Sequence, residues 1–234
     1  MVVIRRIAAV PRDRFHLGLM LALTFSTGVI DAVGYLGLDR VFTGNMTGNV
    51  VILGMAIVGA DDLPVLGPLL ALVGFMVGAA LGGRVLRIAG PGWTRRTTVL
   101  FSLVAAVMVA VAVVLFVIED DFPEPVGITI TTVLGAAMGV QAATARFIAV
   151  KDVTTVVVTS TITGLAADSV LGSGQGRGHS LRRASAVLLI LAGAAAGAAL
   201  LKWHLGAGLV LSGGITLVVT VLGAIHANAD GPSA

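Results

Sequence analysis

Eight apolar stretches follow one another along the chain and are separated by short polar segments. They cover residues 17–38, 41–60, 65–88, 97–118, 126–148, 153–171, 183–203 and 206–226. Each has close to the ~20 residues with which a helix crosses the hydrocarbon core of a bilayer. The pattern predicts an all-α fold, a polytopic membrane helix bundle that forms a single membrane domain over residues 1–234.

Two of these stretches are more polar than the other six. Residues 41–60 open with VFTGNMTGN, and residues 153–171 carry VTTVVVTSTITGLAADS. Threonine, serine and asparagine side chains would cost free energy if they faced lipid. We therefore expect both segments to be buried in protein or to line a cavity, as re-entrant or broken helices.

The distribution of lysine and arginine decides whether those two stretches cross the membrane. If all eight cross, 7 basic residues lie on the side of the N-terminus and 8 lie on the other side, which is no bias. If the two polar stretches enter the bilayer and return, 13 of the 15 basic residues lie on the side of the N-terminus. The other side then keeps Arg40 and Lys202, together with the acidic residues Glu119, Asp120, Asp121 and Glu124. Because basic residues in short loops favour the cytoplasm, we predict about six transmembrane helices, with both termini cytoplasmic.

The two polar stretches also resemble each other, within a longer internal repeat. Residues 41–49 align without gaps on residues 157–165, residues 27–32 resemble residues 138–143, and residues 74–81 resemble residues 193–200. We predict repeats at about 15–118 and 126–228. Each repeat would contain three crossings, and an odd number inverts the second repeat relative to the first. The two polar segments would then enter from opposite sides and meet near the middle of the membrane.

The composition supports a membrane protein and argues against several other classes. The chain is 57% hydrophobic and only 12% charged, with a mean hydropathy of +1.03. Soluble domains carry roughly 25% charged residues. We interpret the net charge of +3 as membrane-orienting and expect no nucleic-acid partner. The chain has no cysteine, its four histidines lack metal-binding spacing, and no Ser–His–Asp or HExxH pattern occurs. We therefore expect no metal, no cofactor and no enzymatic activity.

Most candidate functional residues lie in the first half. Asp31 is near the middle of the first crossing, where an ionisable group costs at least ~2.5 kcal/mol unless it faces the bundle interior. One interpretation is a proton or cation site, and the other is a structural anchor that accepts hydrogen bonds from amides of a broken helix. Thr43, Asn45, Thr47 and Asn49 follow. They could line the N-terminus of a half-helix whose free amides favour an anionic or polar group, or they could simply cap it.

The second half offers fewer candidates. Thr159 and Thr163 would point the same way on a helix, although membrane threonines often bond back to their own backbone. Gln141 could approach Asp31 or form an ordinary interhelical hydrogen bond. Asp168 is expected to pair with Arg182 or Arg183. Small-residue faces should allow close helix packing, either within the chain or in a homodimer; they comprise Gly74, Gly78, Gly82, Gly193 and Gly197.

Residues 28–54, GVIDAVGYLGLDRVFTGNMTGNVVILG, together with the later MGVQAA and TSTITGL blocks, resemble the YoaK family of bacterial membrane proteins. The resemblance covers essentially the whole chain. It implies a six-helix inner-membrane protein, and it implies no substrate because that family is classed by a domain of unknown function. One position departs from the family pattern, since Ala142 follows Gln141 where asparagine is expected.

Three functions are compatible with these patterns. The first is a transporter for a small polar solute or ion, which Asp31 could couple to protons. The second is a channel lined by the two polar segments. The third is a non-transporting scaffold in the lipid bilayer, whose small-residue faces bind other helices. We favour the transporter because it accounts for the inverted repeat, the polar segments and the carboxylate together.

Overall fold

The computed structural model describes residues 10–118, 122–148, 158–168 and 177–229, and these form helices and no strand. Each of the eight predicted stretches contains one helix. The helices are α2 (Arg12–Gly37), α3 (Met46–Ile57), α4 (Leu66–Leu86), α5 (Arg95–Val117), α6 (Glu124–Ile148), α7 (Val158–Ala167), α8 (Arg177–Leu201) and α9 (Leu205–Ala229). The predicted helix bundle is confirmed.

Six of these helices are long and apolar enough to cross a membrane, namely α2, α4, α5, α6, α8 and α9. The other two, α3 with 12 residues and α7 with 10 residues, reach only about 15–18 Å at 1.5 Å per residue. They lie in the two polar stretches, so the prediction of six crossings and two shorter elements is confirmed for the described residues.

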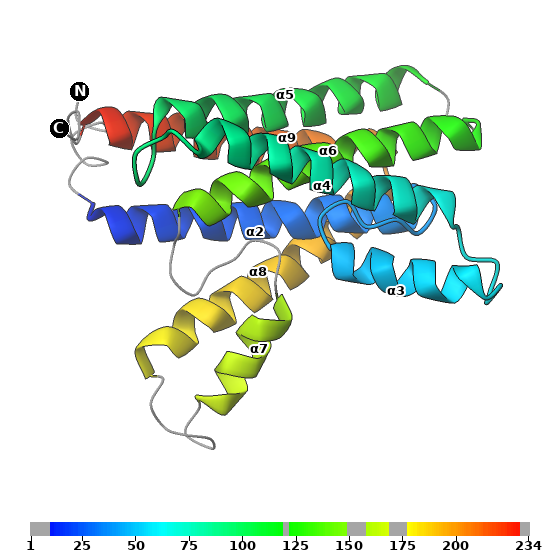
Figure 1. Ribbon diagram of the computed structural model, residues 1–234, viewed down its shortest axis with the longest axis horizontal. Coiled ribbons are helices and arrows are strands. Elements are labelled where there is room, and N and C mark those ends of the chain that lie inside the picture. Colours follow the sequence, from blue (N-terminus) through cyan, green and yellow to red (C-terminus); the bar gives the residue numbers. More distant parts are fainter. Residues whose placement is uncertain (1–9, 119–121, 149–157, 169–176, 230–234) are drawn as a thin grey trace.

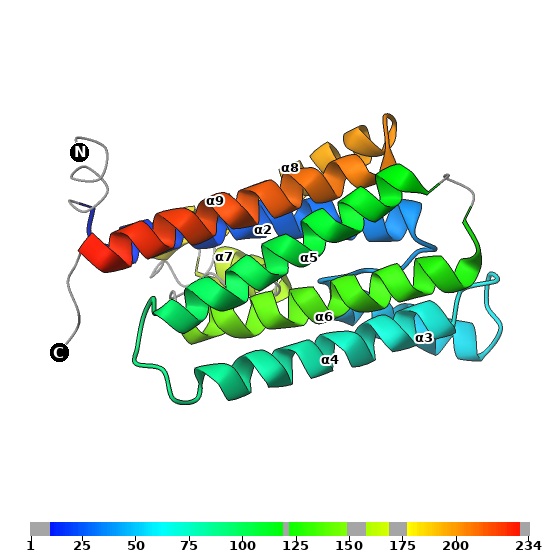
Figure 2. The same cartoon turned by 90° about the horizontal axis from the view of Figure 1, so that it is seen from above.

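The long helices α2, α4, α5, α6 and α9 run roughly along one axis, whereas α8 crosses α2 obliquely (Figure 1). Helix α2 begins at the end of the bundle where α9 ends (Figures 1 and 2). Helix α2 packs against α8 and α9, α6 packs against α4 and α5, and α5 packs against α9. The short helix α3 lies on α4, and α7 lies on α8. Both short helices are therefore attached to the outside of long neighbours.

Glycines set the closest approaches between the long helices. A Cβ atom at Gly78 of α4 would overlap the carbonyl oxygen of Ala136 in α6, and one at Gly193 of α8 would overlap the carbonyl oxygen of Phe25 in α2. The predicted small-residue faces thus pack helix on helix within one chain. Ser26 and Ser212 join α2 to α9 by donating to each other's backbone carbonyls at 3.3 and 3.2 Å.

Local sequence explains where several helices begin. Thr94 precedes α5 and forms a capping box with Thr97, which pairs amides that a helix start leaves open. Pro68 and Pro125 lie in the first turns of α4 and α6, where a missing N–H costs no helical hydrogen bond. At the far end of the chain, His226 of α9 stacks on Phe15 of α2 with ring centroids 4.2 Å apart.

Candidate functional site

Asp31 of α2 binds the backbone that leads into the short helix α3. Its Oδ1 atom accepts hydrogen bonds from the backbone N–H groups of Thr43 at 3.1 Å, Gly44 at 2.7 Å and Asn45 at 3.3 Å. The side chain is buried, with 7% of its surface exposed. The carboxylate therefore occupies the N-terminal end of α3, where amides without a helical partner and the helix dipole stabilise negative charge.

This geometry bears on the two interpretations of the half-helix amides. The N–H groups of Thr43, Gly44 and Asn45 already bind an anion that the chain itself supplies, the carboxylate of Asp31. The predicted anchor is present. A role for Asp31 in binding an ion or solute stays a prediction. Such a ligand would bind the other carboxylate oxygen, Oδ2, because Oδ1 already accepts the three backbone hydrogen bonds.

Glycine at position 44 makes this approach possible. A Cβ atom there would lie 3.0 Å from the methyl group of Thr27, 3.1 Å from the terminal methyl group of Met138 and 3.4 Å from Asp31 Oδ1. Any larger residue would have to push the backbone away from the carboxylate. The short Gly44 hydrogen bond thus depends on the missing side chain.

Two asparagines complete the start of α3. Asn45 is the N-cap residue, and its side chain accepts a hydrogen bond from the N–H of Gly48 at 3.4 Å. Asn49 is fully buried; it accepts from the N–H of Phe42 at 2.8 Å and donates to the carbonyl oxygen of Phe42 at 2.6 Å. Asn45 therefore caps the helix, as predicted, and Asn49 holds the preceding loop.

A cavity of about 460 Å³ lies between α2, the start of α3, the start of α7 and α8. Four of the predicted site residues line it: Asp31, Asn45, Thr47 and Thr159. The first residues of both short helices thus meet at one cavity, although they are more than 100 positions apart in the sequence. Its volume is within the roughly 300–1,000 Å³ of small-molecule sites.

The other four predicted residues do not line this cavity. Thr163 donates to the carbonyl oxygen of Thr159 at 2.9 Å, which is the back-bonding interpretation. Asn49 is turned to the Phe42 backbone. Thr43 and Gln141 are fully buried, and among the described residues the Gln141 amide has no hydrogen-bond partner. Gln141 therefore forms neither of its two predicted contacts.

Other predicted charges behave as expected or fall outside the described residues. Arg183 donates to Asp168 at 2.6 Å, so the predicted structural pair forms. Glu119, Asp120, Asp121 and Lys151, as well as residues 1–9, lie outside the described residues. Among the residues that the structure describes, no group of three acidic or histidine side chains could hold a metal ion.

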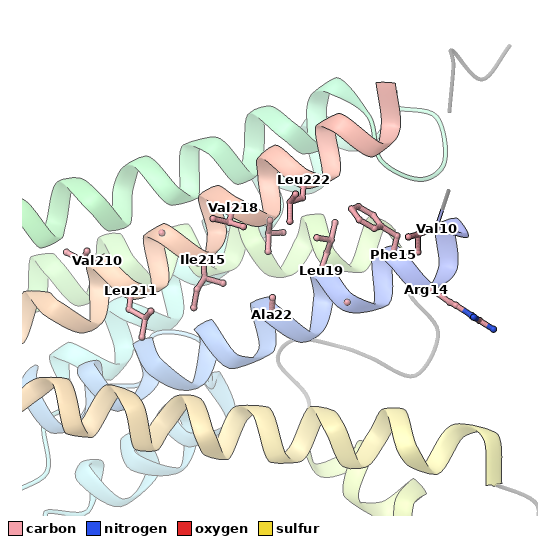
Figure 3. A pocket seen from close by; sticks show the side chains of 13 residues that line it. Val10, Arg14, Phe15, Leu19, Ala22, Val210, Leu211, Ile215, Val218 and Leu222 are labelled. Atoms are coloured by element: carbon pink, nitrogen blue, oxygen red, sulfur yellow. The ribbon is translucent and has the colours of Figure 1, made fainter. Parts of the chain in front are cut away.

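A second, larger hollow of about 750 Å³ runs between α2 and α9 and is lined almost entirely by carbon (Figure 3). Phe15, Leu19, Ile215 and Leu222 point into it, and Arg14 lies at one end with its guanidinium group directed away (Figure 3). It offers a polar solute no hydrogen-bonding wall. The smaller cavity at Asp31 is therefore the candidate site.

Comparison with known proteins agrees with the predicted membrane protein. The model of a family described as "Protein of unknown function (DUF1275)" matches residues 19–222. The chain belongs to this family. Over 151 residues it is 32% identical to the "UPF0700 transmembrane protein YoaK" of Bacillus subtilis (strain 168). The match covers 64% of this chain and 65% of that relative. No solved structure matches. The chain is thus a multi-pass transmembrane protein of a family whose function is unknown.

Several cavity residues of this DUF1275 protein were not among the sequence candidates. Thr27 and Tyr35 line the cavity beside Asp31, and their spacing of four residues on either side of Asp31 places all three on one face of α2. That spacing was a usable signal. Phe42, Val158 and Ile190 also line the cavity, but only the folded loop and the approach of α8 bring them there.

Proposed function

We propose that this chain transports a small polar solute across the inner membrane and binds it in the cavity at Asp31. The observation that carries the proposal is the cavity itself, where polar groups from the starts of two short helices converge beside α2 and α8, two of the six candidate membrane spans. Short or broken helices that end at a site within the bundle are the usual way in which transporters bind polar solutes in the membrane.

An inverted repeat supports alternating access to this cavity. If α2 is matched with α6, α3 with α7, α4 with α8 and α5 with α9, every packed helix pair maps onto another packed pair or onto itself. Figure 1 draws the long members of each match running in opposite directions. This is the arrangement expected of two halves related by an axis in the membrane plane.

Individual contacts support the same match. Gly28 faces the carbonyl oxygen of Ile190 and the amide of Ala194, and Gly139 faces the carbonyl oxygen of Phe75 and the amide of Ala79. Ile190 follows Phe75 by 115 positions, and Ala194 follows Ala79 by the same number, whereas Gly139 follows Gly28 by 111 positions. The α4 and α8 helices therefore align with one constant offset, and α2 and α6 align with another. With the offset of 115, Gly78 is equivalent to Gly193 and Gly82 to Gly197. The sequence alignment of residues 74–81 with residues 193–200 is therefore shifted by four residues, about one helical turn.

The orientation follows from the charges at the helix ends. Basic side chains mark the end of the bundle where α2, α5 and α8 start and where α4 and α6 finish: Arg12, Arg84, Arg95, Arg146 and Arg182. We place this end in the cytoplasm. Asp61→Cys should then react with a membrane-impermeant maleimide added to intact cells, whereas Arg95→Cys should react only after permeabilisation. Met108→Cys, which is buried, is the unreactive control. Labelling of both loops in intact cells would overturn the topology.

Uptake into proteoliposomes tests the transport proposal. The full chain is reconstituted into sealed phosphatidylethanolamine–phosphatidylglycerol vesicles and offered a panel of labelled cationic, neutral polar, zwitterionic and anionic solutes. We expect saturable uptake of one class of solute. The variants Thr47→Leu and Thr159→Leu should lose this uptake, because both threonines line the cavity. Ser185→Ala, an exposed hydroxyl on α8 that bonds to its own helix, is the matched control.

Other results would favour the other functions. Ohmic current or unsaturable osmotic swelling indicates a channel. Vesicles that stay impermeable to every solute, with a membrane protein that co-purifies, indicate a scaffold. For proton coupling, Asp31→Asn should abolish the dependence of uptake on a pH gradient; unchanged dependence would contradict that part of the proposal.

A further inference from the structure

We propose that the solute bound in the Asp31 cavity is a small organic cation, held between this carboxylate and the aromatic rings of Tyr35 and Phe42. The inference rests on the transport function proposed above and names the class of its substrate. It is carried by three features of the cavity wall: its charge, its aromatic pair and its apolar remainder.

The charge of the wall is negative. Asp31 is the one charged side chain among the described residues that line the cavity, and it is 7% exposed. Its Oδ1 atom is engaged by three amides at the start of α3, and a helix N-terminus supplies about half a positive charge. A cation near Oδ2 would complete the neutralisation of a carboxylate held away from water, whereas an anion would be repelled.

The aromatic pair lies one helical turn from this carboxylate. Tyr35 follows Asp31 by four residues on α2, and its ring stacks on Phe42 with centroids 4.8 Å apart and planes at 23°. Both rings line the cavity. Aromatic faces attract ammonium groups, and clusters of aromatic rings bind quaternary ammonium ligands. The carboxylate of Asp31 adds a complementary negative charge beside the two rings.

The remainder of the wall suits a carbon-containing ligand better than a bare ion. Val51, Ile52, Val158 and Ile190 contribute apolar surface on the sides formed by α3, α7 and α8. A volume of about 460 Å³ greatly exceeds the ~30 Å³ of one water molecule. A metal ion would leave most of this space without a favourable partner, while the alkyl groups of an amine would fill it.

Matched ligands and variants test the class. Binding of choline and tetramethylammonium to the purified full chain is measured by calorimetry against 3,3-dimethyl-1-butanol, the neutral isostere of choline, and against potassium and pivalate. We expect saturable binding of the two ammonium ions alone. Asp31→Asn and Phe42→Leu should each weaken it by about tenfold or more. Tyr35→Phe should retain it, and Tyr35→Leu should not.

Phe116→Leu is the control variant, because that ring stacks on His204 with centroids 4.1 Å apart and does not line the cavity. Its affinity for choline should be unchanged. An equal loss in Phe116→Leu would overturn the assignment, as would preferential binding of potassium, pivalate or the neutral isostere.

The outcome for transport is separable from the outcome for ligand class. Saturable uptake of neutral or anionic solutes, with no binding of ammonium ions, keeps the transporter and overturns the cation. Binding of ammonium ions that depends on Asp31 and Phe42, without uptake of any solute into vesicles, keeps the cation site and overturns the transporter.

Discussion

In the proposed internal repeat the two short helices are equivalent, but they are held in different ways. Helix α3 is fixed at its N-terminal end by Asp31 and Asn49. In the alignment of the two halves, these positions carry Ala142 and Leu165, which have no polar side-chain group. Helix α7 is instead tied near its C-terminal end, where Arg183 of α8 binds Asp168 at 2.6 Å.

Both arrangements suit the helix dipole. A carboxylate stabilises the positive N-terminal end of α3, and a guanidinium group lies near the negative C-terminal end of α7. Gly48 and Gly164 align with each other in the proposed repeat, and different side chains lie over them. The ring of Phe42 lies over Gly48, and the guanidinium group of Arg183 lies over Gly164. The comparison indicates that a short helix can be held by a buried carboxylate or by a partly exposed ion pair.

The largest difference between the halves should appear when the buried carboxylate is removed. Asp31→Ala leaves three amides at the start of α3 without their acceptor, and we expect a loss of about 4 kcal/mol in unfolding free energy. Asp31→Asn keeps a neutral acceptor and should cost about half as much. Unfolding in detergent measures both. Ala142→Ser, at the matching position, should change stability by less than about 0.5 kcal/mol. Equal losses at positions 31 and 142 would remove the contrast.

Glycine substitutions should show where the halves are alike. Gly78→Ala and Gly193→Ala each place a Cβ atom against a backbone carbonyl of the facing helix, so each should cost about 1–3 kcal/mol. At Gly83 and Gly214 the same Cβ atom meets open space, and alanine there should be neutral or stabilise by up to about 1 kcal/mol. Thermal unfolding of the four variants in detergent is the measurement. A harmless Gly193→Ala beside a damaging Gly78→Ala would contradict the equivalence of the two interfaces.

The contrast between the halves also separates what sequence can predict from what it cannot. Apolar stretches of near-constant length predicted the six long helices, because lipid imposes one requirement on every crossing. The two short helices were distinguished by the polar residues in their stretches. The predicted anchor at Asp31 followed from the cost of a buried charge. The sequence did not predict Phe42 as a cavity residue. Its contact with Tyr35 depends on the conformation of a loop that the Asn49 side chain holds by hydrogen bonds. The sequence also could not predict that the Gln141 amide has no hydrogen-bond partner among the described residues. A polar side chain in a membrane helix leads one to expect a hydrogen bond, but the sequence does not say which residue would form it.

Asn49 gives a smaller test of the first half alone. Replacing it with leucine, the residue at the matching position 165, removes both hydrogen bonds to the Phe42 backbone. We expect a loss of about 2 kcal/mol and faster hydrogen exchange at the Phe42 amide. Thr163→Val is the control in the second half, because that hydroxyl bonds only within its own helix and should matter by less than about 0.5 kcal/mol. Unchanged exchange at Phe42 would show that Asn49 does not hold the loop.

The smallest effect is expected at the ion pair of the second half, and salt should distinguish it from the buried anchor. Asp168 is 38% exposed at its side chain, so Asp168→Asn should cost at most about 1 kcal/mol. Raising the salt concentration from about 0.01 to 1 M shortens the screening length from ~30 to ~3 Å and should remove most of that cost. The penalty of Asp31→Asn should persist, because that carboxylate is buried against amides that salt does not screen. If both penalties fell together as salt rose, Asp31 would be accessible to ions from solution, and the two short helices would be held by the same kind of contact.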